Sequence, residues 1–181
     1  MLKIVDNWLG DEDLVRFLDR QFTYKTPHHY IEYADSTNAP PSIFGKKHNQ
    51  ETKSQIFYSY DFNPQEPLIK FLVIKAIETV EDQLGIAGLD CVRCHLSIQH
   101  SGQDVEWHSD GSEITCVYTS STPGGGTFDF VTLDGVQKID FVKNKLIIFD
   151  GVQKHMAKAP EANRPRILLV MKLAKSKSLK I

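Results

Sequence analysis

Three side chains in the second half of the chain have the types and spacing that suit a metal ion. His108 and Asp110 are two residues apart, so on an extended segment both side chains point to the same side. His155 follows Asp110 by 45 positions, on a different segment, and can complete one face of a metal. Two imidazoles and one carboxylate, with the other coordination positions left open, suit non-haem Fe(II). The pattern therefore predicts a metal centre at these three residues.

Arg166 is a candidate ligand-binding residue near this metal centre. It stands 11 residues after His155 and begins an apolar run, so an adjacent antiparallel strand would point it into the same interior. A buried guanidinium is costly unless it is paired, and a carboxylate ligand can pair with it in bidentate geometry. Taken singly, Arg166 could cap a surface strand and His155 could be a hydrogen-bonded structural residue. The combination favours a site.

Short runs rich in β-branched and aromatic residues fill the chain from Leu89 onward, and glycine-containing or polar turns separate them. About eight strands with this spacing indicate a sandwich or a barrel. The expected strands are Leu89–Gln99, Asp104–His108, Ile114–Thr119, Thr127–Val131, Gln137–Phe141, Leu146–Asp150, Gln153–Lys158 and Arg166–Leu173. The basic run that starts at Lys172 is expected to fray as a tail.

The first half of the chain favours helices. Asp11 is placed to cap a helix that reaches about Gln21, and an apolar stripe predicts a longer helix over Pro64–Leu84 that stops at Gly85. Short strands are expected at Lys3–Asp6, Tyr30–Tyr33 and Gln55–Asp61. The polar segment Asp35–Lys53 is interpreted as a loop that covers a site or as a tolerated surface insertion. Helices first and strands second indicate an α+β protein.

Composition limits the classes of partner. The 181 residues fit one domain, and the net charge of −2 implies no general attraction to nucleic acid. No apolar run approaches the length of a membrane span and no signal peptide is evident, so we expect a cytoplasmic protein without a membrane partner. Three cysteines, Cys91, Cys94 and Cys116, are expected to be free thiols.

Several motifs of the second half follow one another in a recognisable order. They are His108-x-Asp110, Ile114–Tyr118, the glycine-rich Gly124–Phe130, Val142–Phe149, His155 and Arg166–Val170. In this order the chain resembles the 2-oxoglutarate/Fe(II)-dependent oxygenases, in their prolyl 4-hydroxylase-like branch. The start Ile4–Leu9, followed by an acidic helix start, is also similar to the way these proteins begin.

The resemblance implies a single oxygenase domain over residues 1–181, with a double-stranded β-helix (jelly-roll) core of about eight antiparallel strands. Residues 1–88 would support the barrel with helices and strands, residues 89–174 would form the core, and residues 175–181 would be a basic tail. The family commonly carries a Tyr upstream of the first metal His. Here Gln99, or its neighbour Ile98 or His100, takes that place.

The resemblance also implies roles for individual residues. His108, Asp110 and His155 would hold Fe(II), and Arg166 would pair with the far carboxylate of the cosubstrate 2-oxoglutarate, with Arg164 as the alternative. Either Tyr118 or Thr119 would add a hydroxyl to that carboxylate, since only one of them can face inward. O₂ would be the second cosubstrate, and ascorbate an optional reductant.

The implied activity is hydroxylation of a substrate C–H bond with release of succinate and CO₂, on a prolyl or other residue of a protein or peptide. The alternatives are an oxygenase that acts on a free amino acid, a small metabolite or nucleic acid, and a non-catalytic cupin-like metal-binding module. The net charge of −2 argues against nucleic acid. Arg166 argues against a metal-binding module, which needs no buried arginine. The oligomeric state does not follow from the sequence.

Overall fold

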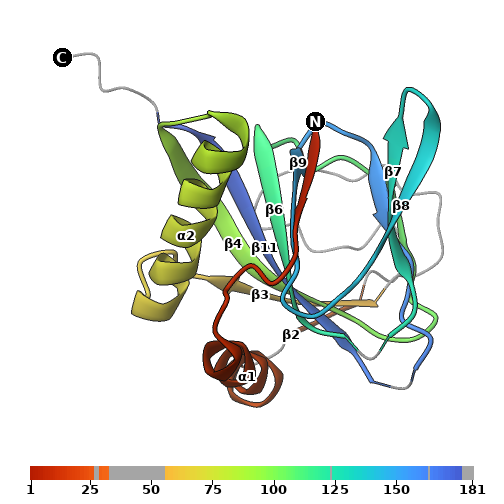
Figure 1. Ribbon diagram of the computed structural model, residues 1–181. Helices are drawn as coiled ribbons and strands as arrows, with labels where there is room; N and C mark the ends of the chain where they lie inside the picture. The colour runs from red at the N-terminus through yellow and green to blue at the C-terminus, as the bar shows by residue number, and fades with distance from the viewer. Residues whose placement is uncertain (27–28, 33–55, 123, 163, 177–181) are drawn as a thin grey trace.

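Two antiparallel sheets form the frame of the protein. The computed structural model describes residues 1–26, 29–32, 56–122, 124–162 and 164–176 (Figure 1). In spatial order the larger sheet holds β1 (Leu2–Val5), β9 (Leu146–Asp150), β6 (Ile114–Ser121), β11 (Arg166–Lys175), β4 (Leu89–Gln99), β3 (Ile56–Phe62) and β2 (His29–Glu32). The smaller sheet holds β5 (Val105–His108), β10 (His155–Ala157), β7 (Thr127–Thr132) and β8 (Gly135–Asp140).

The α+β class and the jelly-roll core are confirmed. All eight strands expected from Leu89 onward are present as β4 to β11, and every pairing between them is antiparallel. The expected end of the last strand is wrong. β11 continues to Lys175, paired with β4 along its whole length, so Lys172 lies inside the sheet rather than in a frayed tail. The loop expected over Asp35–Lys53 lies outside the described residues.

The helices begin and end near the expected residues. Helix α1 (Glu12–Arg20) is capped by Asp11 and continues as a π-helical turn, η1 (Gln21–Lys25), which the sequence pattern does not indicate. Helix α2 (Pro67–Leu84) starts at Pro67 rather than at Pro64, because Pro64 lies in a turn in which the N–H of Glu66 donates to the carbonyl oxygen of Asn63. Gly85 ends α2 with φ of 67°, a left-handed conformation that favours glycine.

Two apolar cores lie on the two faces of the larger sheet. In Figure 1, α2 and the β7–β8 hairpin lie on opposite sides of this sheet. One core joins the helices to the outer face of the sheet, with Leu72 and Leu96 among its buried members. The other fills the space between the sheets, where Phe130, Ile147 and Val170 meet. Among the described residues, no helix combines the length and the apolar character needed to cross a bilayer.

The cap of α1 gives a first testable prediction. One carboxylate oxygen of Asp11 accepts hydrogen bonds from the backbone N–H groups of Asp13 and Leu14, at 2.9 and 3.1 Å. Asp11→Ala removes this acceptor, so we expect a loss of about 1 kcal/mol in the free energy of unfolding by urea. Asp11→Ser retains a capping oxygen and serves as the control. Equal stability of the Ala and Ser variants would contradict the assigned cap.

Candidate metal centre

The larger part of the predicted metal centre comes from two neighbouring strands. His108 ends β5 and His155 begins β10, and these two residues are direct partners in the antiparallel register of the smaller sheet. The centroids of their rings lie 4.3 Å apart. Asp110 follows β5, and its backbone N–H donates to the carbonyl oxygen of Gly151 at 2.8 Å, which ties it to the turn before β10. The structure thus brings all three predicted residues together.

The ligand atoms converge on one point. One donor atom from each of His108, Asp110 and His155 lies within 4.8 Å of the others. The Nε2 atom of His108 lies 3.9 Å from Oδ1 of Asp110, and the Nε2 atom of His155 lies 3.8 Å from Oδ2. Within the described chain, these three residues are the group of metal-ligating side chains found to cluster in this way.

Hydrogen bonds leave the same nitrogen of both histidines available. The Nδ1 atom of His108 contacts the carbonyl oxygen of Glu106 at 2.7 Å, and that of His155 contacts the carbonyl oxygen of Gln153 at 2.8 Å. A carbonyl oxygen only accepts, so each Nδ1 must carry a proton, and Nε2 is the nitrogen through which each imidazole can bind a metal. This backbone support is typical of metal-binding histidines.

The surroundings of His155 keep its ring neutral. The aromatic rings of Phe128, Phe130 and Phe149 contact it, with centroid distances of 5.2, 5.8 and 4.7 Å. Burial in this apolar bed, together with the nearby His108, lowers the pKa of His155 to about 4. A metal ligand must be unprotonated, so the imidazole is in the form that binding requires at neutral pH.

Asp110 is held as a charged carboxylate. Its Oδ2 atom accepts from the hydroxyl of Thr115 at 2.9 Å, and its Oδ1 atom lies 2.8 Å from the ammonium nitrogen of Lys172. Burial acts to raise the pKa of this carboxyl, but Lys172, His155 and Thr115 together hold it below its usual value. A hydrogen-bonded carboxylate beside two imidazoles is a donor set suited to Fe(II).

Thr115 gives a second prediction. This fully buried side chain is not one of the three clustered ligands and holds the carboxylate of Asp110 through its hydroxyl. Partners of this kind typically affect metal affinity by 10- to 100-fold, so Thr115→Val should weaken Mn(II) binding about tenfold. Calorimetric titration with Mn(II) measures this, and Thr115→Ser, which retains the hydroxyl, should bind as the unmodified protein does. Unchanged binding by the valine variant would contradict the role given to the hydroxyl.

Arg166 lies fully buried at the start of β11. Its guanidinium donates to the side-chain oxygen of Gln99 and to the carbonyl oxygens of Gly125 and Lys158, and it stacks on the ring of Phe141 at 3.5 Å. These hydrogen-bond partners are neutral, and the Nε atom is buried without a hydrogen-bond partner. Burial lowers the pKa of Arg166 to about 9, with Asp104 acting against the shift. The group therefore stays charged at neutral pH.

Gln99 fills the place where the resemblance would put a tyrosine. It is the direct strand partner of Arg166, and its amide nitrogen donates to the carbonyl oxygen of Ala157 at 2.9 Å. Its amide oxygen accepts from Arg166. The side chain thus connects the larger sheet to β10 and positions the guanidinium between them. Nothing in the strand pattern alone indicates this contact.

The other residues expected to bind the cosubstrate differ in where their side chains lie. Tyr118 lies on the outer face of the larger sheet, where its ring contacts Trp8 at 5.2 Å, so the expectation that it could face the site is not met. Thr119 has the opposite parity, pairs with Leu168 of the inner core, and has a buried hydroxyl without a hydrogen-bond partner. Arg164 is exposed and precedes β11, whereas Arg166 is buried.

The residues present fit Fe(II) and 2-oxoglutarate. The buried guanidinium of Arg166 hydrogen-bonds to neutral oxygens, and the buried hydroxyl of Thr119 lacks a partner, so each group offers a donor suited to a carboxylate. The glycine turn before β7 packs closely against the segment that follows β10. Gly126 has φ of 71°, and a side chain there would collide with the backbone oxygens of Lys158 and Ala159.

Two other features lie away from this centre. The cysteines are free, as expected, and burial raises the pKa of Cys91 to about 11, which makes it a poor nucleophile.

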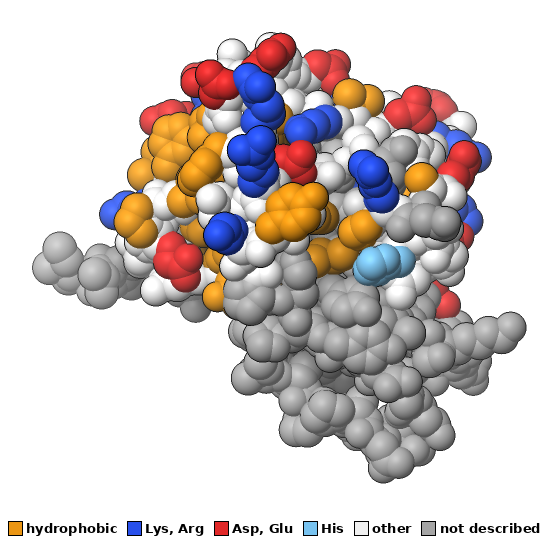
Figure 2. Space-filling view, turned by 90° about the horizontal axis from the view of Figure 1, so that it is seen from below, with side chains coloured by type: hydrophobic (Ala, Val, Ile, Leu, Met, Phe, Trp, Pro, Cys, Tyr) orange, Lys and Arg blue, Asp and Glu red, His pale blue; other side chains and the backbone are white. Residues whose placement is uncertain are grey.

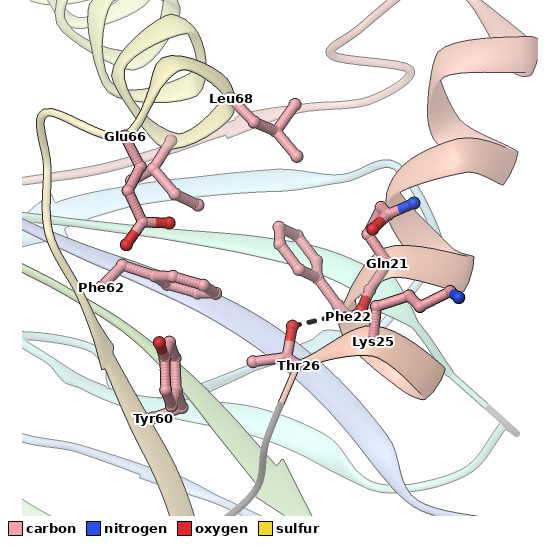
Figure 3. Close-up of a pocket in the computed structure, with 9 residues that line it drawn as sticks. Gln21, Phe22, Lys25, Thr26, Tyr60, Phe62, Glu66 and Leu68 are labelled. Carbon is pink, nitrogen blue, oxygen red and sulfur yellow. Dashed lines mark hydrogen bonds between the residues drawn. The ribbon is translucent and has the colours of Figure 1, made fainter.

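A cavity of about 200 Å³ lies on the helix side of the larger sheet (Figure 3), lined by Phe22 of η1, Phe62 of β3 and Ile69 of α2 among others. The sheet separates this cavity from the histidines.

Similarity to known proteins is found in structure rather than in sequence. No protein-family model and no curated protein matches the sequence. Solved structures do match. An oxidoreductase of the 2OG-Fe(II) oxygenase family from Burkholderia pseudomallei has 12% sequence identity and a TM-score of 0.73, over 97% of this chain and 85% of that chain.

Two further structures represent different kinds of ligand. A prolyl hydroxylase from Trichoplax adhaerens, in complex with a hypoxia inducible factor peptide fragment, has 17% identity and a TM-score of 0.66, over 96% of this chain and 83% of that chain. HygX from Streptomyces hygroscopicus, with nickel, 2-oxoglutarate and hygromycin B bound, has 10% identity and a TM-score of 0.67, over 97% and 83%. The chain therefore has the fold of the 2OG-Fe(II) oxygenases, prolyl hydroxylases among them.

Proposed function

We propose that this protein is an Fe(II)- and 2-oxoglutarate-dependent dioxygenase that hydroxylates a C–H bond of its substrate. One observation supports this function above all others. The cluster of His108, Asp110 and His155 lies between the same two sheets as Arg166, a buried cation whose hydrogen bonds go to neutral oxygens. A metal-binding module has no use for such a cation, whereas a dicarboxylate cosubstrate needs both groups.

Each residue has a defined task in this proposal. His108, Asp110 and His155 would hold Fe(II), and Arg166 would bind the far carboxylate of 2-oxoglutarate, with Gln99 orienting its guanidinium. Fe(II) with this cosubstrate and O₂ supplies the oxidising chemistry, with succinate and CO₂ as products. The phenylalanines around His155 exclude water from one side of the centre.

The substrate that we favour is a prolyl or other residue of a protein or peptide. The fold is shared with a prolyl hydroxylase in complex with a peptide, although fold alone does not determine substrate. A small molecule is the second candidate, since HygX has the same fold and was solved with hygromycin B. Figure 2 shows basic and acidic side chains interspersed on the face seen from below. The net charge of −2 gives no support to nucleic acid as a substrate.

A product screen tests the proposed activity. The protein is incubated with Fe(II), 2-oxoglutarate, ascorbate and either proline-containing peptides or small metabolites, and the products are analysed by mass spectrometry. We expect one substrate class to gain the mass of one oxygen atom, together with one succinate per product. Peptide products would support the favoured class, and products among the metabolites alone would replace it with the second candidate. Absence of succinate under all these conditions would contradict the proposal.

A further inference from the structure

A second cation lies beside the metal ligands. Lys172 is on the same strand as Arg166, six residues later, so both side chains have the same parity and face the inside of the barrel. At about 3.3 Å per residue, the Cα atoms of the two lie roughly 20 Å apart along β11. The ammonium nitrogen of Lys172 is 2.8 Å from Oδ1 of Asp110 and 3.4 Å from its backbone oxygen. Only 16% of this side chain is exposed.

The wall next to Lys172 is polar along its whole length. Cys94, Leu96 and Ile98 of β4 pack into the core on the helix side, so the alternate residues of that strand face inward. These inward residues are Arg93, His95, Ser97 and Gln99. The inner faces of β6 and β11 are mixed, with the apolar Val117 and Val170 beside the polar Thr115 and Thr119. The inner face of β4 thus forms a polar strip, which runs from Gln99 beside Arg166 to Arg93 beside Lys172.

Two details show that the end of this strip next to Lys172 is suited to a ligand. Arg93 is the direct strand partner of Lys172 and pairs with Asp61 at 2.9 Å, so its charge is already balanced. His95 stands two residues deeper, and its Nδ1 atom is buried without a hydrogen-bond partner. Burial, with help from Arg93 and Lys172, lowers the pKa of His95 to about 3, so the ring adds no charge. Lys172 and Asp110 therefore dominate the local electrostatics.

Metal binding changes the balance between these two residues. The carboxylate of Asp110 is the counter-charge that Lys172 contacts, at 2.8 Å. A divalent cation on the same carboxylate leaves an excess of positive charge, and the partly buried ammonium then lacks a full counter-charge. An anion that approaches along the polar strip supplies it.

We propose that Lys172 is a specificity-determining residue that binds an anionic group of the substrate, a carboxylate or a phosphate, once Asp110 holds the metal. This inference rests on the proposed function and narrows its substrate class to molecules with a negative group near the bond that reacts. The lysine binds that group as a point charge, and the unpartnered nitrogen of His95 offers a hydrogen bond beside it.

The test uses the full chain loaded with Mn(II). 2-Oxoglutarate is first titrated into the protein without O₂, and acetate, inorganic phosphate or neutral acetamide is then titrated into the resulting complex. Calorimetry and the Mn(II) electron paramagnetic resonance signal report binding. We expect acetate or phosphate to bind and acetamide not to bind. Which of the two anions binds more tightly identifies the class of the group.

Variants show whether the anion binds at Lys172 or at another cation of the protein. Lys172→Met keeps the length of the side chain and should weaken anion binding about tenfold, whereas Lys172→Arg should retain it. Lys143→Met is the matched control, because Lys143 pairs with Asp19 on the helix side and should leave anion binding unchanged. Binding of 2-oxoglutarate should be the same in all of these variants.

Three results would overturn the inference. One is that acetate and phosphate bind no better than acetamide, and another is that Lys172→Met binds them as well as the unmodified protein does. The third is that Lys172→Met loses affinity for 2-oxoglutarate, which would assign the ammonium to the cosubstrate. If the unmodified protein fails to bind 2-oxoglutarate, the proposed function itself fails. If 2-oxoglutarate binds normally but acetate and phosphate bind no better than acetamide, only the role of Lys172 is disproved.

Discussion

Replacing Arg166 with methionine is expected to weaken 2-oxoglutarate binding to the Mn(II)-loaded protein by about 100-fold or more. The guanidinium is fully buried and its hydrogen bonds go to neutral oxygens, so its charge is available for the far carboxylate. Removing one partner of a buried charge pair costs about 3 to 5 kcal/mol, which corresponds to a factor of more than 100 in affinity. Calorimetric titration with 2-oxoglutarate measures the change.

Two variants show whether the effect belongs to this residue. Arg164→Met alters an exposed arginine two positions away and should leave the affinity for 2-oxoglutarate unchanged. Arg166→Lys keeps a charge but loses the planar fork, so an intermediate loss is expected. Affinity for Mn(II) should stay the same in all three proteins, because Arg166 is not one of the clustered metal ligands. A larger loss from Arg164→Met than from Arg166→Met would reverse the assignment.

The second large effect is expected from His108→Ala, which should abolish measurable Mn(II) binding and all succinate formation. The substitution removes one of three converging ligands and leaves an incomplete set. His108 is one third exposed, whereas His155 is buried among phenylalanines, so His108 can be removed with less damage to the core. Circular dichroism and urea unfolding establish that the variant is folded.

A matched histidine completes this experiment. His100→Ala changes a half-buried histidine near the end of β4 that does not belong to the cluster, and it should retain Mn(II) binding. If His108→Ala bound Mn(II) with the affinity of the unmodified protein, the three residues would not be the metal site, whatever the fold.

Much of the fold can be predicted because local patterns agree with it. The runs that form β4 and β9 are predicted with their observed ends, since turn residues bound apolar segments there. The metal cluster can also be found, because the register of β5 and β10 places His108 directly opposite His155. In that case two sequence-distant histidines need only an antiparallel pairing to meet.

The rest depends on long-range packing that no local pattern expresses. Whether Tyr118 or Thr119 faces the site depends on which face of β6 the helices cover. Tyr118 lies on the covered, outer face, where its ring packs against Trp8. The sequence around Lys172 indicates a basic tail because its neighbours are rich in lysine and serine. Its pairing with Arg93 and Thr115 on both sides, which places it beside Asp110, is a property of the assembled sheet.

The most direct test of the central claim is the conversion of 2-oxoglutarate to succinate, followed by proton nuclear magnetic resonance. The reaction contains the full chain, Fe(II), ascorbate and air, with and without the mixture of candidate substrates. We predict succinate from the unmodified protein, more of it when a substrate is present, and none from His108→Ala or from Arg166→Met at low cosubstrate concentration. Equal, background levels of succinate from all three proteins in every mixture would contradict the account.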